Sequence, residues 1–395
     1  MQKGIDIQHS FVQLKAYCEQ SAFKGYDPYD GLNSPLFQHL PFISKNKYCR
    51  LAWIQFFKRS PIDFRKWVGI KPGYNPKAIG LFLSAYVKLY QRSKDEALLP
   101  QIDFFSQKII ELTTPGYSGH CWGYNFDWQA KAFFQPKGTP TIVASSFIAN
   151  ALLDAYDLNK KEELLQIARS TCDFILNDLN RETDEQGNIA FSYSPLDKSV
   201  VYNASLLGAR LLSRVYAYTK EDILKNTAAA TVRYCCMKQK ADGSWAYGNY
   251  DFHQWVDNFH TGYNLECIAD YMKYTGDHSC EAVLEKGFQY YIQTFFGKDG
   301  VPHYYSHSIY PIDIHAPSQL VITLQKLNKA HDHMDILNKV MHWTIEHMQS
   351  PKGYFYYQIN RWGTSRIPYM RWSQAWMMLA FATYFLIEDA KKTEP

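Results

Sequence analysis

The chain has 395 residues, of which 46% are hydrophobic and 16% aromatic, and its formal net charge is +4. This composition is typical of a protein with a large core, and a nearly balanced charge without a clustered basic stripe argues against a nucleic-acid partner. No run of about 20 apolar residues is present, so no helix is expected to span a membrane, and the first residues lack the apolar core of a signal peptide.

Residues 1–70 form the least regular part of the sequence. Helices are expected over Ser10–Phe23 and Lys47–Lys58, and the loop Gly25–Pro35 between them is rich in turn residues, Asp and Tyr. We expect this segment to pack on, and close, a ring that is formed by residues 71–395, so that the chain is one domain overall.

Two kinds of helical pattern alternate from residue 71 onward. Helices that are apolar nearly all round are expected to be buried, and helices with a charged stripe are expected to face water. The expected inner helices are Pro76–Gln91, Ile142–Leu158, Tyr202–Tyr218, Thr261–Tyr274, Pro317–Lys329 and Trp372–Glu388. The expected outer helices are Asp95–Leu112, Lys161–Leu179, Glu221–Met237, Cys280–Phe295 and His333–Met348. The sequence therefore predicts an all-α (α/α)6 toroid with short β-turn loops, whose sixth outer helix comes from the amino-terminal segment.

A short phrase returns five times, each time after an outer helix and before the next inner one. It consists of a turn glycine followed by an aromatic residue, one further residue and a tyrosine. The copies begin at Gly119, Gly187, Gly243, Gly300 and Gly353. Such a regular period of roughly 50 to 70 residues indicates a repeat architecture. Function is expected in the loops that carry the phrase, at one end of the helical scaffold.

Two segments and the overall pattern of helices resemble known groups of proteins. Gln239-Lys-Ala-Asp-Gly-Ser-Trp245 resembles the Gln-x-x-Asp-Gly-Ser-Trp repeat of the prenyltransferase and squalene-cyclase toroids. The helical alternation is similar to that of six-hairpin glycosidases, α/α-toroid polysaccharide lyases and uronyl epimerases. The segment Tyr369–Trp376 is similar to a phrase in bacterial proteins of exopolysaccharide biosynthesis clusters. The resemblance implies a toroid linked to bacterial polysaccharide biosynthesis. The Asp-x-Asp-Asp and Asp-Asp-x-x-Asp motifs of terpene chemistry are missing, so an isoprenoid cyclase-like toroid is a minor alternative.

The richest candidate site lies between Tyr250 and His260. Asp251, His253, Asp257 and His260 are candidate catalytic residues, and Asn258 is a candidate substrate ligand. Histidine titrates near neutral pH, and the carboxylates could act as acid, base or orienting groups. The alternative interpretation is that the aspartates only cap backbone groups of turns and helices.

A second candidate stretch runs from His303 to His315, at the same place in the next repeat. Its candidate catalytic residues are Tyr305 and Asp313, and its candidate substrate-binding residues are Tyr304, His307 and Tyr310. Toroid geometry would place this stretch beside the first one. A solvated aromatic loop is the alternative, and a metal site is less favoured because no helical His-x-x-x-His pair is present.

Further substrate-binding candidates combine aromatic faces with arginines. Aromatic rings suit sugar rings, and the planar guanidinium suits carboxylates. These candidates are Trp122, Tyr124, Asp127, Trp128, Tyr202, Asn203, Trp245, Arg361, Trp362, Arg366, Arg371 and Trp372. For the last group the alternative is a surface loop of salt-bridged arginines.

The favoured function is a carbohydrate-active enzyme that acts on a polysaccharide or oligosaccharide containing uronic acid. Lyase or C5-epimerase chemistry is slightly preferred because histidine and tyrosine are so dense in these loops. The alternatives are an inverting or retaining glycoside hydrolase, which needs two carboxyl groups, and a non-catalytic glycan-binding or scaffold protein. The oligomeric state is not predicted.

The sequence gives no sign of a cofactor or of disulfides. No nucleotide-binding glycine loop is visible, so no cofactor is expected. The eight cysteines are scattered, without Cys-x-x-Cys spacing, and most fall on helical patterns. We expect reduced thiols, no bound metal and a cytoplasmic location.

Overall fold

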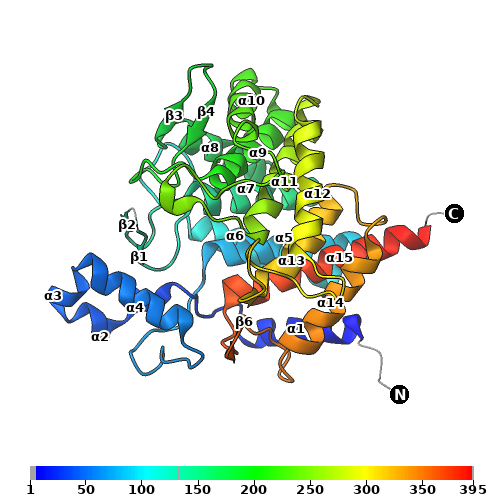
Figure 1. The fold of residues 1–395 in the computed structure, drawn as a ribbon. Helices are drawn as coiled ribbons and strands as arrows, with labels where there is room; N and C mark the ends of the chain where they lie inside the picture. Colours follow the sequence, from blue (N-terminus) through cyan, green and yellow to red (C-terminus); the bar gives the residue numbers. More distant parts are fainter. Residues whose placement is uncertain (1–5, 132, 394–395) are drawn as a thin grey trace.

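In the computed structural model, which describes residues 6–131 and 133–393, six inner helices form a closed ring, and they are labelled in Figure 1. Each helix packs against the next, and the last packs against the first. In chain order they are α5 (Pro76–Ser93), α7 (Ile142–Asn159), α9 (Tyr202–Thr219), α11 (Asn258–Thr275), α13 (His315–Lys326) and α15 (Ala375–Thr393). The predicted all-α toroid is confirmed.

A second layer of helices surrounds this ring. It consists of α6 (Leu99–Glu111), α8 (Glu162–Asn177), α10 (Asp222–Cys236), α12 (Glu281–Phe295) and α14 (Met334–Met348), together with α1 (Ile7–Gln20), which packs against α14 and α15. The difference in burial follows the sequence pattern, because α7 buries 12 of its 18 residues and α8 buries seven of 16. The short helix η2 (Glu96–Leu98) leads into α6.

Side-chain hydrogen bonds set the starts of two inner helices, and α11 begins earlier than the sequence predicts. Helix α11 starts at Asn258 rather than Thr261, because the Asp257 carboxylate accepts a hydrogen bond from the His260 backbone N–H and caps the helix. Helix α15 follows a π-helical turn, η4 (Met370–Gln374), which is held by two hydrogen bonds between the Gln374 side chain and the backbone of Phe355.

The glycines of the repeated phrase bring each turn against an outer helix of the next hairpin. A Cβ at Gly119 would overlap the Ser170 carbonyl of α8, and a Cβ at Gly353 would overlap the backbone of Gln13 in α1. Gly243 and Gly300 meet α12 and α14 in the same way. Gly187 has open space around its Cβ position, and there the β3–β4 hairpin contacts α10 instead. The main role of the phrase is therefore to pack each hairpin closely against the next one.

Short antiparallel strands lie in the loops at one end of the ring. The strands β1 (Trp128–Gln129) and β2 (Phe134–Gln135) pair, as do β3 (Arg181–Thr183) and β4 (Ile189–Phe191). A three-stranded sheet joins β5 (Ile312–Asp313), β6 (Gln358–Asn360) and β7 (Gly363–Ser365) in that order. A further short helix, η3 (Asp251–His253), lies in the loop before α11.

The segment before α5 extends from the ring. It contains η1 (Asp30–Asn33), α2 (Pro35–Gln38), α3 (Pro41–Ser44) and α4 (Lys47–Arg59), and the last three project to one side in Figure 1. Buried ion pairs anchor its base: Arg65 pairs with Asp30, and Arg371 Nη2 lies 2.8 Å from Asp27 Oδ1.

Buried ion pairs also fill the end of the ring away from the phrase loops. Arg210 and Lys326 both pair with Asp270, and Arg214 pairs with Asp154 at 2.7 Å. These mid-helix carboxylates are therefore neutralised inside the scaffold. None of the described helices is both long enough and apolar enough to cross a bilayer.

The close contact at Gly119 predicts a stability effect. Gly119→Ala should lower the free energy of unfolding by about 1–3 kcal/mol, because the new methyl group forces the turn away from α8. Urea unfolding followed by circular dichroism measures it. Gly363→Ala is the matched control, since nothing lies within 4 Å of its Cβ position. Equal stability of the two variants would contradict this packing role.

Candidate functional site

A cavity of about 550 Å³ lies where the amino-terminal ends of the inner helices converge. Its volume is in the range of small-molecule sites. All six positions around the ring contribute to its lining, through Lys77, Val143, Asn203, His260, His315 and Arg371. The amino-terminal end of a helix carries a partial positive charge, so this end of the ring favours anionic groups.

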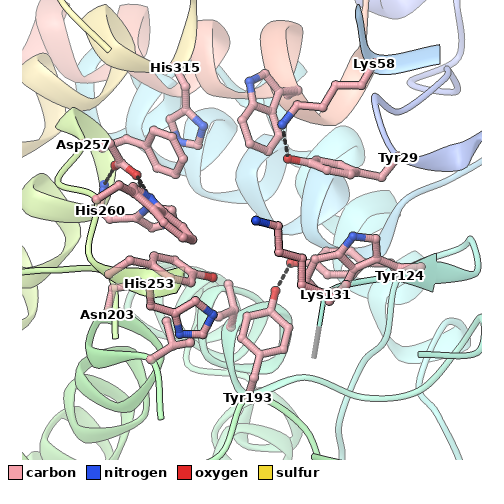
Figure 2. Close-up of a pocket in the computed structure, with 18 of the residues that line it drawn as sticks. Tyr29, Lys58, Tyr124, Lys131, Tyr193, Asn203, His253, Asp257, His260 and His315 are labelled. Carbon is pink, nitrogen blue, oxygen red and sulfur yellow. Dashed lines mark hydrogen bonds and ion pairs between the residues drawn. The ribbon is translucent and has the colours of Figure 1, made fainter. Parts of the chain in front are cut away.

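The centre of the site is a hydrogen-bonded pair between Asp257 and His260 (Figure 2). Asp257 Oδ2 lies 2.7 Å from His260 Nδ1 and also accepts a hydrogen bond of 3.1 Å from the Trp255 indole. A carboxylate only accepts hydrogen bonds, so Nδ1 carries the proton and Nε2 of the cavity-lining ring is the basic nitrogen. This arrangement orients an imidazole to act as a general base.

Tyrosines stand beside this pair. Tyr305 forms a β-bridge with Asp257, and the rings of Tyr304 and Tyr305 meet edge to face with centroids 4.4 Å apart. Burial raises the pKa of both hydroxyls, and the negative charge of Asp257 raises them further. Both tyrosines therefore hold their protons at neutral pH and can donate them.

His315 lies in the cavity wall in a neutral form. Its ring stacks on Phe259 with centroids 4.3 Å apart, and its Nε2 lies 2.8 Å from the Tyr263 hydroxyl. Burial, and then the positive charge of Lys77, lowers the pKa of His315 well below its ordinary value. The Nδ1 atom has no hydrogen-bond partner within the described residues.

His253 lines the opposite wall and is neutral for a similar reason. It packs edge-on against Tyr247 and Trp255. Burial, followed by repulsion from Lys131, lowers its pKa to about 4. Its Nδ1 is also without a partner among the described residues.

Cationic side chains outnumber carboxylates around the cavity. The basic lining residues are Lys58, Arg59, Lys77, Lys131 and Arg371, of which Arg371 is paired with Asp27. Asp257 is the one Asp or Glu that lines the cavity within the described chain. Lys131 reaches into the cavity in Figure 2, and Lys58 Nζ donates to the Tyr29 hydroxyl at 3.1 Å. The site is therefore electropositive and suits an anionic ligand.

Lys77 occupies an aromatic part of the floor. Its Nζ lies 4.0 Å from the ring centroid of Phe147 and 5.3 Å from that of Trp376. Burial, and then the charge of Arg371, lowers the pKa of Lys77 well below its ordinary value. Burial therefore disfavours the charged form of this amine, which still has N–H groups to donate to a ligand.

Two expected catalytic carboxylates do not line the cavity, and this corrects the expectation for them. Asp313 is fully buried behind the wall, where it accepts hydrogen bonds from the His315 backbone and from the Trp372 indole, each at 2.9 Å. Burial raises its pKa to about 6, and its contacts show that it positions these two groups. Asp251 lies on the exposed side of η3.

The expected substrate-binding residues divide into two groups. Six of them line the cavity, namely Tyr124, Trp128, Asn203, Tyr304, Arg371 and Trp372. Others are structural: Trp122 and Trp245 are buried, and their indole N–H groups donate to the carbonyls of Ile109 and Cys235. These tryptophans close each turn onto its own outer helix, so we no longer propose them as sugar contacts.

The remaining expected ligands also lie outside the cavity lining. Asn258 is buried and donates to the His303 carbonyl, Asp127 accepts from the Lys137 backbone, and Tyr202 donates to Asn249. The others are exposed on loops, and they are His307, Tyr310, Arg361, Trp362 and Arg366. Their contacts are with backbone, neighbouring loops or solvent, which removes them from the proposed site.

Several lining residues were not among the sequence candidates. They are Tyr29, Lys58, Lys77, Tyr193, Tyr247, Trp255, Tyr263 and His315. Lys77 offered a signal, because it is a lysine in the first turn of an otherwise apolar inner helix, and Tyr247 stands in the repeated phrase. Tyr29 and Lys58 come from the irregular amino-terminal segment, where no pattern indicates them. Within the described residues no three His, Cys, Asp or Glu side chains converge as a metal site would require.

The fold is shared with solved structures of sugar-acting proteins. The chain superposes on cellobiose 2-epimerase from Bacillus thermoamylovorans with a TM-score of 0.63 and 16% identity, over 80% of this chain and 88% of that one. It is similar to an unsaturated glucuronyl hydrolase specific for heparin (TM-score 0.64, 10% identity, 97% and 96% covered). A GH76 α-mannanase from Bacteroides thetaiotaomicron has a TM-score of 0.61 and 14% identity, with 80% and 88% covered. At these identities the likeness establishes the toroid fold.

Comparisons of sequence give no relative. No protein-family model matches the chain, and no curated protein sequence matches it.

The lowered pKa values of His253 and His315 predict that neither imidazole titrates between about pH 5 and 8. Burial in the folded protein disfavours the charged imidazole, so both groups should stay neutral as the pH falls from 8 to 5. Histidine nitrogen NMR on labelled protein measures this, with assignment by His253→Gln and His315→Gln. An imidazolium signal from either residue at pH 6 would contradict the burial argument.

Proposed function

We propose that this protein is a carbohydrate-active enzyme that moves a proton at a sugar carbon adjacent to a carboxylate, as a lyase or C5-epimerase does. The observation that carries the proposal is Asp257, the one carboxylate that lines the cavity among the residues that the structure describes. It is hydrogen-bonded to the imidazole of His260 inside a ring of cationic and aromatic side chains. This arrangement supplies a base and a positive environment for a uronate.

The lining suits a sugar. Aromatic faces such as Trp128, Trp255 and Trp372 offer apolar surfaces, and the tyrosine hydroxyls and Asn203 offer hydrogen bonds. The toroid fold is also that of proteins whose names include a sugar epimerase, a glucuronyl hydrolase and a mannanase. These likenesses support a carbohydrate substrate.

The chemistry assigns one role to each kind of group. Lys131 neutralises the uronate carboxylate, which makes the proton on C5 more acidic. The Nε2 atom of His260 takes that proton, and Asp257 stabilises the imidazolium that forms. In a lyase reaction the bond from C4 to its oxygen then breaks, and Tyr305 protonates the departing oxygen. In an epimerase reaction the bond from C4 to its oxygen stays intact, and a protonated tyrosine hydroxyl of the lining gives its proton to C5 from the face opposite His260.

Glycoside hydrolysis fits the site less well. A hydrolase of the usual kind places two carboxyl groups about 5 to 10 Å apart across the scissile bond. Asp257 is held by three donors. Asp313 lies behind the wall, where Oδ1 accepts from Trp372 and His315 and Oδ2 accepts from Gln358. The sequence alone prefers lyase or epimerase chemistry only slightly over glycoside hydrolysis, and the positions of these two carboxylates add support for proton transfer.

The base assignment predicts a loss of activity in His260→Ala. With uronate-containing oligosaccharides in D2O, the wild type should incorporate deuterium at C5 or produce an unsaturated product. The kcat of His260→Ala should fall by about 10²- to 10⁴-fold. Asp257→Asn should lose less activity, because the imidazole of His260 remains, although the carboxylate that fixes the proton on Nδ1 is gone.

His342→Ala, an exposed histidine on α14, is the matched control and should retain full activity. New reducing ends without exchange at C5 would show a hydrolase instead. Tight glycan binding with no product would show a non-catalytic binding protein.

The charge of the cavity predicts selectivity for anionic sugars. Lys131→Ala should raise KM for a uronate oligosaccharide about tenfold, because Lys131 reaches into the cavity, and should change KM for a neutral analogue little. Lys137→Ala is the matched control, since Lys137 is exposed after the same hairpin and does not line the cavity. Equal effects of the two substitutions would contradict a role for Lys131 in binding the carboxylate.

A further inference from the structure

Residues 34–71, which we call the arm, expose an unusual amount of apolar surface. In the described chain 17 large hydrophobic side chains are exposed, and eight of them lie between residues 36 and 67. They are Leu36, Leu40, Phe42, Ile43, Tyr48, Phe56, Ile62 and Trp67. Phe42 is 93% exposed, and Tyr48 and Trp67 are each 76% exposed. Exposed apolar side chains that are concentrated in one segment indicate an interaction surface.

The arm is also the source of the protein's positive charge. It contains eight Lys or Arg and one Asp, a formal charge of +7, whereas the rest of the chain has 34 Lys or Arg against 37 Asp or Glu, a charge of −3. The one acid, Asp63, already pairs with Arg65 at 3.2 Å. Five of the cations are exposed, namely Lys45, Lys47, Arg59, Lys66 and Lys71. None of these five has an ion pair within the described residues.

The exposed apolar side chains cannot simply turn inward. Phe37 and Ile54 of the arm form a small core with Leu32 of η1, against which Trp128 and Phe134 also pack. Trp53 stacks on Phe37 with 5.0 Å between ring centroids. That core is filled from one face of α2 and α4, which leaves the other side chains outside. In Figure 1 the helices α2 and α3 lie at the tip of the arm, away from the ring.

We propose that the arm docks on the surface of an anionic lipid bilayer. Peripheral membrane binders combine exposed aromatic and aliphatic side chains with Lys and Arg, and an anionic leaflet attracts such a surface. The centres of protein–protein interfaces are instead depleted of lysine. A second copy of the chain is disfavoured because two arms of charge +7 repel each other.

Docking would bring the cavity close to the membrane. Helix α4 carries both surfaces, because Leu51, Gln55, Lys58 and Arg59 line the cavity while Tyr48 and Phe56 point to solvent. The proposal does not depend on the reaction that the cavity performs.

Vesicle flotation of the full chain tests the proposal. The protein should float with vesicles of phosphatidylcholine and phosphatidylglycerol, at least about tenfold more than with phosphatidylcholine alone, and high salt should release it. Phe42→Ser should weaken binding about tenfold. Lys45→Glu combined with Lys47→Glu should weaken it by at least about tenfold. Because these side chains are exposed, the thermal unfolding midpoints should stay at the wild-type value.

Matched controls lie at the other end of the ring. Ile223→Ser removes an apolar side chain that is 58% exposed at the start of α10, and Lys94→Glu combined with Lys220→Glu reverses two exposed charges in the connections between inner and outer helices. Both controls should bind vesicles like the wild type.

Three results would overturn the proposal. The first is equal binding to anionic and zwitterionic vesicles, or none to either. The second is equal weakening in the arm variants and the controls. The third is a wild-type dimer in light scattering that Phe42→Ser makes monomeric without any vesicle binding, which would show that a second copy covers the arm.

Discussion

The ring depends on the close approach of four of the five turn glycines to the outer helix of the next hairpin. At Gly119, Gly243, Gly300 and Gly353 there is no room for a side chain, because backbone of the neighbouring helix occupies the space. The last of these contacts reaches α1, so the first helix in the sequence completes the outer layer. Repeated around the ring, this contact fixes the angle between hairpins and turns the start of every inner helix toward the same end.

That common orientation creates the site. Six helix starts converge on one cavity, each adding a partial positive charge, and the loops between them supply the aromatic walls. The amino-terminal segment contributes Tyr29 and Lys58 to the lining, and its Asp27 and Asp30 hold Arg371 and Arg65 in buried ion pairs. Removing one partner of such a pair would leave a buried charge uncompensated. The segment is therefore tied to the π-helical turn that presents Arg371 and Trp372.

The polar residues of the site differ in burial and in hydrogen-bond partners, and they therefore have different roles. Asp257 faces an imidazole and caps a helix, whereas Asp313, buried behind the wall, has a pKa raised to about 6 and orients Trp372. His253 and His315 are held neutral by burial, which leaves His260 as the histidine with a carboxylate partner. Such separation of roles among similar groups is typical of sites that carry out acid–base chemistry.

The sequence by itself determined the toroid, because alternating apolar and amphipathic helices and a repeated glycine phrase act locally and recur in every hairpin. It also indicated the His253–His260 stretch, where acids and histidines are dense within one loop. Only the tertiary structure decided which residues share the cavity. Trp122 and Asp313 turned out to support the scaffold, whereas Lys58 and Lys77 entered the site from segments far apart in the chain. The reason is that helix rotation and loop packing set side-chain direction, and these depend on neighbours that are distant in sequence.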